Sequence, residues 1–243
     1  MFMKIKESIQ TVQVLDSSME IFLFIPDCNE PVAGLVLAQH IPGHSGIEND
    51  AFTLAAARRF AEQGFAVAVP FIFHWWPKGD GMDSKREQSR DDWTVQDMKS
   101  AFDLLQKQKE VDANRIGITG HCWGGRVAWL AACHIPECKA LVVFYGGNIK
   151  KALGEGNAPP IELANNITCP VTGFFGNEDA NPSPEDVDDY SAALSDAGIS
   201  HEFYQYDGAG HAFQNFPVAE RYHEQASEDA WEKVMLFLKE TLS

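Results

Sequence analysis

The strongest constraint on the fold is an alternation of short apolar runs with amphipathic segments of helical length. The runs that predict strands are Gly34–Ala38, Phe65–Pro70, Ile116–Thr119, Ala140–Tyr145, Val171–Phe175 and Glu202–Tyr206. The segments that predict helices are Asn49–Glu62, Thr94–Lys107, Gly124–Cys133, Pro184–Ala197 and Glu220–Thr241. Several runs are apolar throughout, which favours strands buried on both faces, as in a parallel sheet.

The N-terminal segment follows a different pattern. Two strand-like runs, Ile5–Val14 and Met19–Ile25, flank a short polar turn, which predicts an antiparallel hairpin. The expected architecture is therefore a three-layer α/β fold, with a mostly parallel sheet, an N-terminal antiparallel hairpin and helices on both faces. No linker rich in Gly, Pro or Ser and no repeat interrupts the chain, so residues 1–243 are expected to form one domain.

Charge and cysteine content narrow the class of protein. The chain has 35 acidic and 19 basic residues and a formal charge of −16, which disfavours binding to nucleic acid or to an anionic membrane surface. The longest apolar stretch, Phe65–Phe73, is too short to span a bilayer, and the N-terminus carries no secretion signal. The five cysteines have no metal-type spacing. We expect a cytoplasmic protein, monomer or homo-oligomer, that acts on a small molecule without metal or cofactor.

The motif that carries chemistry is Gly120-His-Cys-Trp-Gly124, between a predicted strand and a predicted helix. Gly-x-Cys-x-Gly in this context is typical of a nucleophile elbow, with cysteine in the usual place of serine. The turn is so tight that a Cβ at either glycine would meet backbone, and it holds Cys122 in a strained conformation. Its sulfur would lie at a helix N-terminus, which favours the thiolate. The alternative is a buried structural cysteine, and the strand–turn–helix context favours the nucleophile.

A nucleophile of this kind needs a base, and the base needs a carboxylate to fix its tautomer. Asp179 follows the run Val171–Phe175, and His211 follows the run Glu202–Tyr206. Both are therefore expected in loops at the carboxyl edge of the sheet, where the elbow places Cys122. Each alone would be an ordinary turn or polar residue. In the order nucleophile, acid, histidine they predict a catalytic triad.

With these residues identified, the sequence resembles the dienelactone hydrolase family of cysteine-dependent α/β-hydrolases, also called carboxymethylenebutenolidases. The resemblance covers nearly the whole chain and is carried by Val36–His40, Gly64–Pro70, Gly117–Gly125, Gly176–Asp179 and Gly210–Phe213. It implies an α/β-hydrolase fold and hydrolysis of a carboxylic ester bond. It also implies that Cys122 is the nucleophile, His211 the base and Asp179 its orienting carboxylate. The oxyanion would be bound by the backbone N–H groups of Ile41 and Trp123.

Two departures from the family pattern concern activation and substrate binding. The family has a glutamate that helps to generate the thiolate where this chain has His40, which either activates Cys122 or only fills the space. The family holds the substrate carboxylate with two arginines. Arg86 matches one of them, and Asn215 stands in the place of the other. The loss of one guanidinium weakens the case for dienelactone itself as the substrate.

The segment from His74 to Trp93 has no clear periodicity, which predicts a functional or mobile loop. Trp75 and Trp76, with Trp93, are candidates to wall the substrate pocket, and packing against the core is the equal alternative. Arg90 is a candidate replacement for the missing arginine, although its Ser-Arg-Asp-Asp context favours a charge pair at a helix start.

The sequence therefore favours a hydrolase of a small ester or lactone that forms an acyl-enzyme on Cys122. The alternative is a non-catalytic α/β-hydrolase homologue that binds a small molecule. A redox sensor is disfavoured because no resolving cysteine lies near Cys122 in the sequence. His40, His44 and Cys122 lack the spacing of a metal site.

Overall fold

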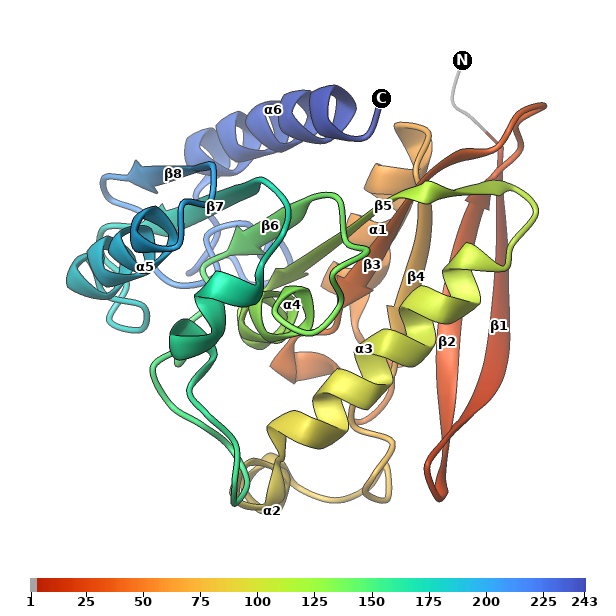
Figure 1. Ribbon diagram of the computed structural model, residues 1–243, viewed down its shortest axis with the longest axis horizontal. Helices are drawn as coiled ribbons and strands as arrows, with labels where there is room; N and C mark the ends of the chain where they lie inside the picture. The colour runs from red at the N-terminus through yellow and green to blue at the C-terminus, as the bar shows by residue number, and fades with distance from the viewer. Residues whose placement is uncertain (1–3) are drawn as a thin grey trace.

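The computed structural model describes residues 4–243 and places one eight-stranded sheet between helices (Figure 1). The strand order is β1-β2-β4-β3-β5-β6-β7-β8. The strands are β1 (Ile5–Val14), β2 (Ser17–Pro26), β3 (Val32–Ala38), β4 (Ala66–Pro70), β5 (Val111–His121), β6 (Leu141–Phe144), β7 (Val171–Gly176) and β8 (His201–Tyr206). β2 pairs antiparallel with β1 and β4, and all other neighbours are parallel. The predicted mostly parallel sheet with an N-terminal hairpin is confirmed.

The helices cover both faces of the sheet. They are α1 (Ala51–Glu62), α2 (Met82–Gln88), α3 (Asp91–Gln106), α4 (Trp123–Ala132), α5 (Pro184–Asp196) and α6 (Glu224–Thr241), with three short 3₁₀ helices, η1 (Ile41–Gly43), η2 (Ile47–Asn49) and η3 (Pro160–Asn166). α1 and α6 meet through Phe60 and Trp231, whose ring centroids lie 4.8 Å apart. α3 and α4 pack on the opposite face against β3 and β5 (Figure 1). β4, β6 and β7 are buried throughout, as their continuous apolar runs predict.

Two segments differ from the expectation from sequence. The segment His74–Trp93 contains the helix α2, and α3 begins at Asp91 rather than at Thr94. α2 has no apolar face to reveal it, because its one buried residue is Lys85, whose Nζ donates to the carbonyl of His44 at 3.0 Å. The last helix begins at Glu224 rather than Glu220, since the imidazole of the preceding histidine accepts the N–H of Ala226 and caps the helix there.

The topology decides where chemistry can occur. β3, β5, β6, β7 and β8 run parallel, so the loops that follow them gather along one edge of the sheet. The loop after β3 carries Ile41, the turn after β5 carries Cys122, and the loops after β7 and β8 carry Asp179 and His211.

Candidate active site

The turn between β5 and α4 holds Cys122 in a backbone conformation that side chains rarely adopt. Cys122 is the N-cap of α4 and has φ 58° and ψ −121°. A Cβ on Gly120 would lie 2.0 Å from the carbonyl oxygen of Gly124, and a Cβ on Gly124 would lie 2.2 Å from that of Ala38. Both glycines are therefore required by close backbone approach. The steric reasoning from the sequence holds at both positions.

The structure brings Cys122, His211 and Asp179 into one hydrogen-bonded chain. The Nε2 of His211 lies 3.0 Å from the Sγ of Cys122, and its Nδ1 lies 2.7 Å from the Oδ2 of Asp179. Asp179 is buried, and its second oxygen accepts the N–H of Asn181 at 2.8 Å. A Cβ on Gly176 would lie 2.2 Å from the carbonyl oxygen of Ala209, so this glycine lets the loops after β7 and β8 approach each other.

Opposing effects set the protonation of His211. Burial lowers the pKa of the imidazole, while the hydrogen bonds to Asp179 and Cys122 raise it, and the result is a pKa raised from 6.5 to about 10. The imidazolium form is thus favoured at neutral pH, where it can pair with a thiolate and later donate a proton. The ring of Tyr145 packs edge-on against this imidazole, with centroids 5.4 Å apart.

Two helices begin beside the cavity that contains the thiol of Cys122. Ile41 opens η1 and Trp123 opens α4, so neither N–H has an acceptor within its own helix. Both residues line the same cavity as Cys122. The close packing of Gly124 on Ala38 sets the distance between the two helix starts. This arrangement can bind an oxyanion that develops on a carbonyl attacked by the sulfur.

The cavity at Cys122 has a volume of about 410 Å³. Its lining is Ile41, Arg86, Cys122, Trp123, Arg126, Gly147, Asn148, Lys151, Leu153, Asn181 and His211. Of the contacts expected from the sequence, the cavity brings Arg86 together with Cys122 and His211. Sequence reasoning missed Arg126, Lys151 and the two asparagines Asn148 and Asn181.

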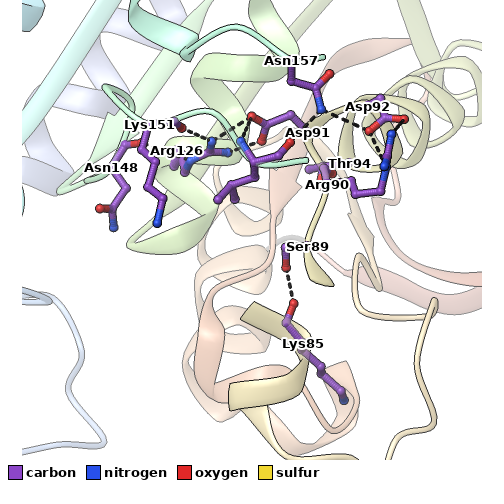
Figure 2. A network of polar contacts seen from close by, with 11 residues as sticks. Lys85, Ser89, Arg90, Asp91, Asp92, Thr94, Arg126, Asn148, Lys151 and Asn157 are labelled. Carbon is purple, nitrogen blue, oxygen red and sulfur yellow. Dashed lines mark hydrogen bonds and ion pairs between the residues drawn. The ribbon is translucent and has the colours of Figure 1, made fainter. Parts of the chain in front are cut away.

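Arg126 is the buried cation of this cavity. Its guanidinium forms two bonds with the carboxylate of Asp91, at 2.6 and 3.0 Å, and donates to the carbonyls of Asn148 and Lys151 (Figure 2). The Oδ2 of Asp91 also accepts the N–H of Leu153 at 2.8 Å. The ion pair therefore fastens the loop after β6 to α3 and α4. One sequence signal was available, an arginine in the otherwise apolar helix that follows the elbow.

His40 has partners of its own away from the thiol. Its side chain is 4% exposed, and Nδ1 lies 2.7 Å from the Oδ2 of Asp50 and 2.9 Å from the Oγ1 of Thr53. Asp50 is also the N-cap of α1, because it accepts the N–H of Thr53. The ring thus ties the loop that carries Ile41 to the start of α1, and an activating role toward Cys122 stays a prediction.

Three other residues expected to contact the substrate, Trp75, Trp76 and Asn215, lie outside the lining of the cavity at Cys122. Trp75 donates from Nε1 to Asp97 and stacks on Trp93 with centroids 4.7 Å apart, which makes it an anchor of the loop after β4. Trp76 bonds to Gln88 of α2. Asn215 is buried within the turn that follows His211. None of Trp75, Trp76 and Asn215 lines the cavity at Cys122.

The remaining candidates are placed as follows. Arg90 pairs with Asp92 at 3.0 Å, the charge pair at a helix start that its sequence context favours.

Within residues 4–243, no group of three or more His, Cys, Asp or Glu side chains is arranged to hold a metal ion. None of the helices in the described part of the chain is long and apolar enough to cross a membrane.

A mostly parallel sheet with an elbow after β5, and with an acid and a histidine on later loops of the same edge, defines an α/β hydrolase. Within this class, the family model described as the dienelactone hydrolase family matches residues 19–242. The chain belongs to that family.

Individual relatives agree with this assignment. A Yersinia pestis protein named "Putative carboxymethylenebutenolidase" is 29% identical over 218 residues, covering 84% of this chain and 77% of the relative. A Salmonella typhimurium protein of the same name is 39% identical over 128 residues, covering 51% of this chain and 46% of the relative, so this match spans about half the length of that protein. A Klebsiella pneumoniae crystal structure named "Putative Dienelactone Hydrolase" is 26% identical with a TM-score of 0.81, covering 97% of this chain and 99% of that one.

Proposed function

We propose that the protein hydrolyses a small carboxylic ester or lactone through an acyl-enzyme on Cys122. One observation carries the proposal: the chain of hydrogen bonds from Asp179 through His211 to Cys122 ends in a cavity that is also lined by Ile41 and Trp123, the first residues of two helices. This combination supplies a nucleophile, a proton carrier and an oxyanion site in one place. Membership of the dienelactone hydrolase family supports the same reaction class.

The proposed reaction has two halves. The Cys122 thiolate attacks the carbonyl carbon, and the oxyanion that forms is bound by the N–H groups of Ile41 and Trp123. The tetrahedral intermediate collapses as its C–O bond breaks, and the leaving oxygen takes the proton of the His211 imidazolium. Neutral His211 then removes a proton from water, and the resulting hydroxide attacks the thioester. When the C–S bond breaks, the acid product leaves and the thiolate–imidazolium pair is restored.

The conformation of Cys122 and the burial of Asp179 support catalysis over passive binding. A backbone at φ 58° costs stability at a non-glycine residue and is retained where the surrounding structure uses it. A buried carboxylate bonded to a histidine fixes the tautomer that leaves Nε2 toward the sulfur. We place this activity in the reducing cytoplasm, because Cys122, Cys133, Cys138 and Cys169 are not joined in disulfides.

The proposal is tested with 4-nitrophenyl acetate on the wild type and on Cys122→Ala. We expect a burst of nitrophenol followed by steady turnover for the wild type, and neither for the variant, which should keep the wild-type fold by circular dichroism. Mass spectrometry of the quenched burst should show one acetyl group on the peptide that contains Cys122. A stoichiometric burst without turnover would indicate a protein that binds and holds acyl groups, and equal hydrolysis by the variant would rule out the covalent route.

A further inference from the structure

The cavity at Cys122 has a charge opposite to that of the whole protein. The chain carries 35 acidic against 19 basic residues. Among the residues that the structure describes, the lining of this cavity includes three cations, Arg86, Arg126 and Lys151, and no aspartate or glutamate. A positively charged cavity on an acidic protein attracts an anionic ligand.

The three cations are not equivalent. Arg126 is 1% exposed and is neutralised by the carboxylate of Asp91. Arg86, on α2, and Lys151, in the loop after β6, are exposed and form no ion pair with any residue between 4 and 243. Two positive charges of the lining are therefore uncompensated by protein.

The neighbour of Lys151 shows that pairing was available in this loop. Lys150 forms ion pairs with both Asp186 and Asp189 of α5, and the pair with Asp186 is 2.7 Å long. These bonds raise the pKa of Lys150 to about 12. Lys151 lies one residue further on, lines the cavity, and has no such partner in the described part of the chain. The two lysines have the same charge and lie in the same loop, but only Lys150 lies beside carboxylates of α5.

The backbone of Lys151 is held firmly at the wall of the cavity. Its carbonyl accepts from the Nη2 of Arg126 at 2.7 Å, and the carbonyl of Asn148 accepts from Nε of the same arginine at 3.3 Å. Figure 2 shows the Lys151 side chain running away from the Arg126–Asp91 pair. Because the anchor lies in the main chain, the ammonium group stays available for a ligand in the cavity.

We infer that Lys151 is a specificity-determining residue whose ammonium, in the same cavity as the thiol and together with Arg86, binds a carboxylate carried by the substrate away from the scissile carbonyl. The inference rests on the proposed hydrolase function of the same cavity. In the family pattern the second cation is an arginine at the position of Asn215, which in this chain is buried and does not line the cavity. Lys151 supplies a second cation from a different loop. A carboxylate bound by a lysine gains a charge-assisted hydrogen bond that an uncharged group cannot form.

The test compares two esters that differ only in the terminal group of the acyl chain, a carboxylate in mono-4-nitrophenyl adipate and a methyl group in 4-nitrophenyl hexanoate. We expect Lys151→Gln to lower kcat/KM for the adipate ester about tenfold through KM, the usual effect of losing one partly exposed charge-assisted hydrogen bond. The hexanoate ester should respond less than twofold. Lys150→Gln is the matched control and should leave both esters unchanged. Lys151→Arg should restore most of the preference, and added salt should reduce it.

The outcomes separate the two proposals. If the wild type hydrolyses none of the three esters, 4-nitrophenyl acetate included, the hydrolase proposal fails. If both esters are hydrolysed in a Cys122-dependent reaction and Lys151→Gln changes their ratio no more than Lys150→Gln does, the assignment of Lys151 is overturned and the hydrolase proposal stands. An increase of kcat/KM for the adipate ester in Lys151→Gln would overturn the assignment as well.

Discussion

A methyl group added at Gly124 tests whether catalysis depends on the close approach of α4, which begins beside Cys122, to the loop after β3, which carries Ile41. The Cβ of an alanine there would lie 2.2 Å from the carbonyl oxygen of Ala38 and 3.0 Å from that of Gln39. Both contacts are backbone, so no flexible side chain can move aside. α4 and the end of β3 must separate by about 1 Å, and a displacement of that size in a catalytic constellation costs roughly hundredfold in rate. The packing strain should destabilise the fold by about 1–3 kcal/mol.

The assay separates stability from catalysis by a matched variant. In Gly117→Ala, on the same strand as the elbow but away from the cavity, the added Cβ would meet the carbonyl oxygen of Ala140 at 3.0 Å. Both variants should lower the denaturation midpoint, and only Gly124→Ala should lower kcat for 4-nitrophenyl acetate in the folded protein. If Gly124→Ala retains the wild-type kcat, the two N–H groups of Ile41 and Trp123 do not depend on this contact and the reasoning is refuted.

Two further predictions concern protonation and reactivity. Iodoacetamide should alkylate Cys122 first, because burial raises the pKa of Cys133 to about 12 and keeps that thiol unreactive; peptide mapping that finds Cys133 labelled first would contradict an activated elbow. The imidazole of His211 should titrate near pH 10 by NMR, and its pKa should be lower in Cys122→Ala, where burial still lowers it and the hydrogen bond to Asp179 still raises it. Since the folded pKa is raised, the contribution of His211 to stability is complete below pH 6.5 and is lost as the pH rises through about 10, and a contribution that grew over this range would oppose the assignment.

The sequence predicted those parts of the fold and site whose cause is local. A continuous apolar run such as Leu141–Phe144 has few alternatives to a strand buried on both faces, and the structure places it inside the sheet, between β5 and β7. The elbow glycines have a steric cause that is visible in five consecutive residues. Asp179 and His211 were found because strand ends in a parallel sheet share one edge, so their positions followed from the strands.

What the sequence did not predict depends on long-range contacts. α2 is a seven-residue polar helix whose buried Lys85 bonds to a carbonyl 41 positions earlier, and no local pattern predicts that contact. From the sequence Trp75 could be a pocket wall or an anchor, and only the fold brings it to the buried Asp97, to which it donates a hydrogen bond. Lys151 could not be told from Lys150 along the chain, because only the fold places Asp186 and Asp189 beside one of them.

The buried pair of Asp91 and Arg126 raises a question of purpose that a substitution can answer. A buried ion pair is weak evidence for stability, because the cost of desolvating both charges offsets their attraction. This pair, however, also bonds the main chain at three points of the loop that carries Lys151. The guanidinium of Arg126 donates four hydrogen bonds, two to the carboxylate and two to carbonyls, whereas the ammonium of a lysine has only three N–H donors.

Arg126→Lys should therefore remain folded, since Asp91 keeps a cationic partner, while the wall of the cavity loses its fixed position. The preference for the adipate ester over the hexanoate ester should fall about threefold to tenfold, because Lys151 would form its charge-assisted hydrogen bond to the substrate carboxylate for less of the time. Thermal denaturation and the kcat for both esters, measured together, distinguish this loss of preference from general damage to the fold, which would lower the rates with both substrates alike. A variant that keeps the wild-type preference would show that the loop holds Lys151 without the guanidinium. The ion pair would then be a packing feature of α3 and α4 rather than the support of the cavity wall.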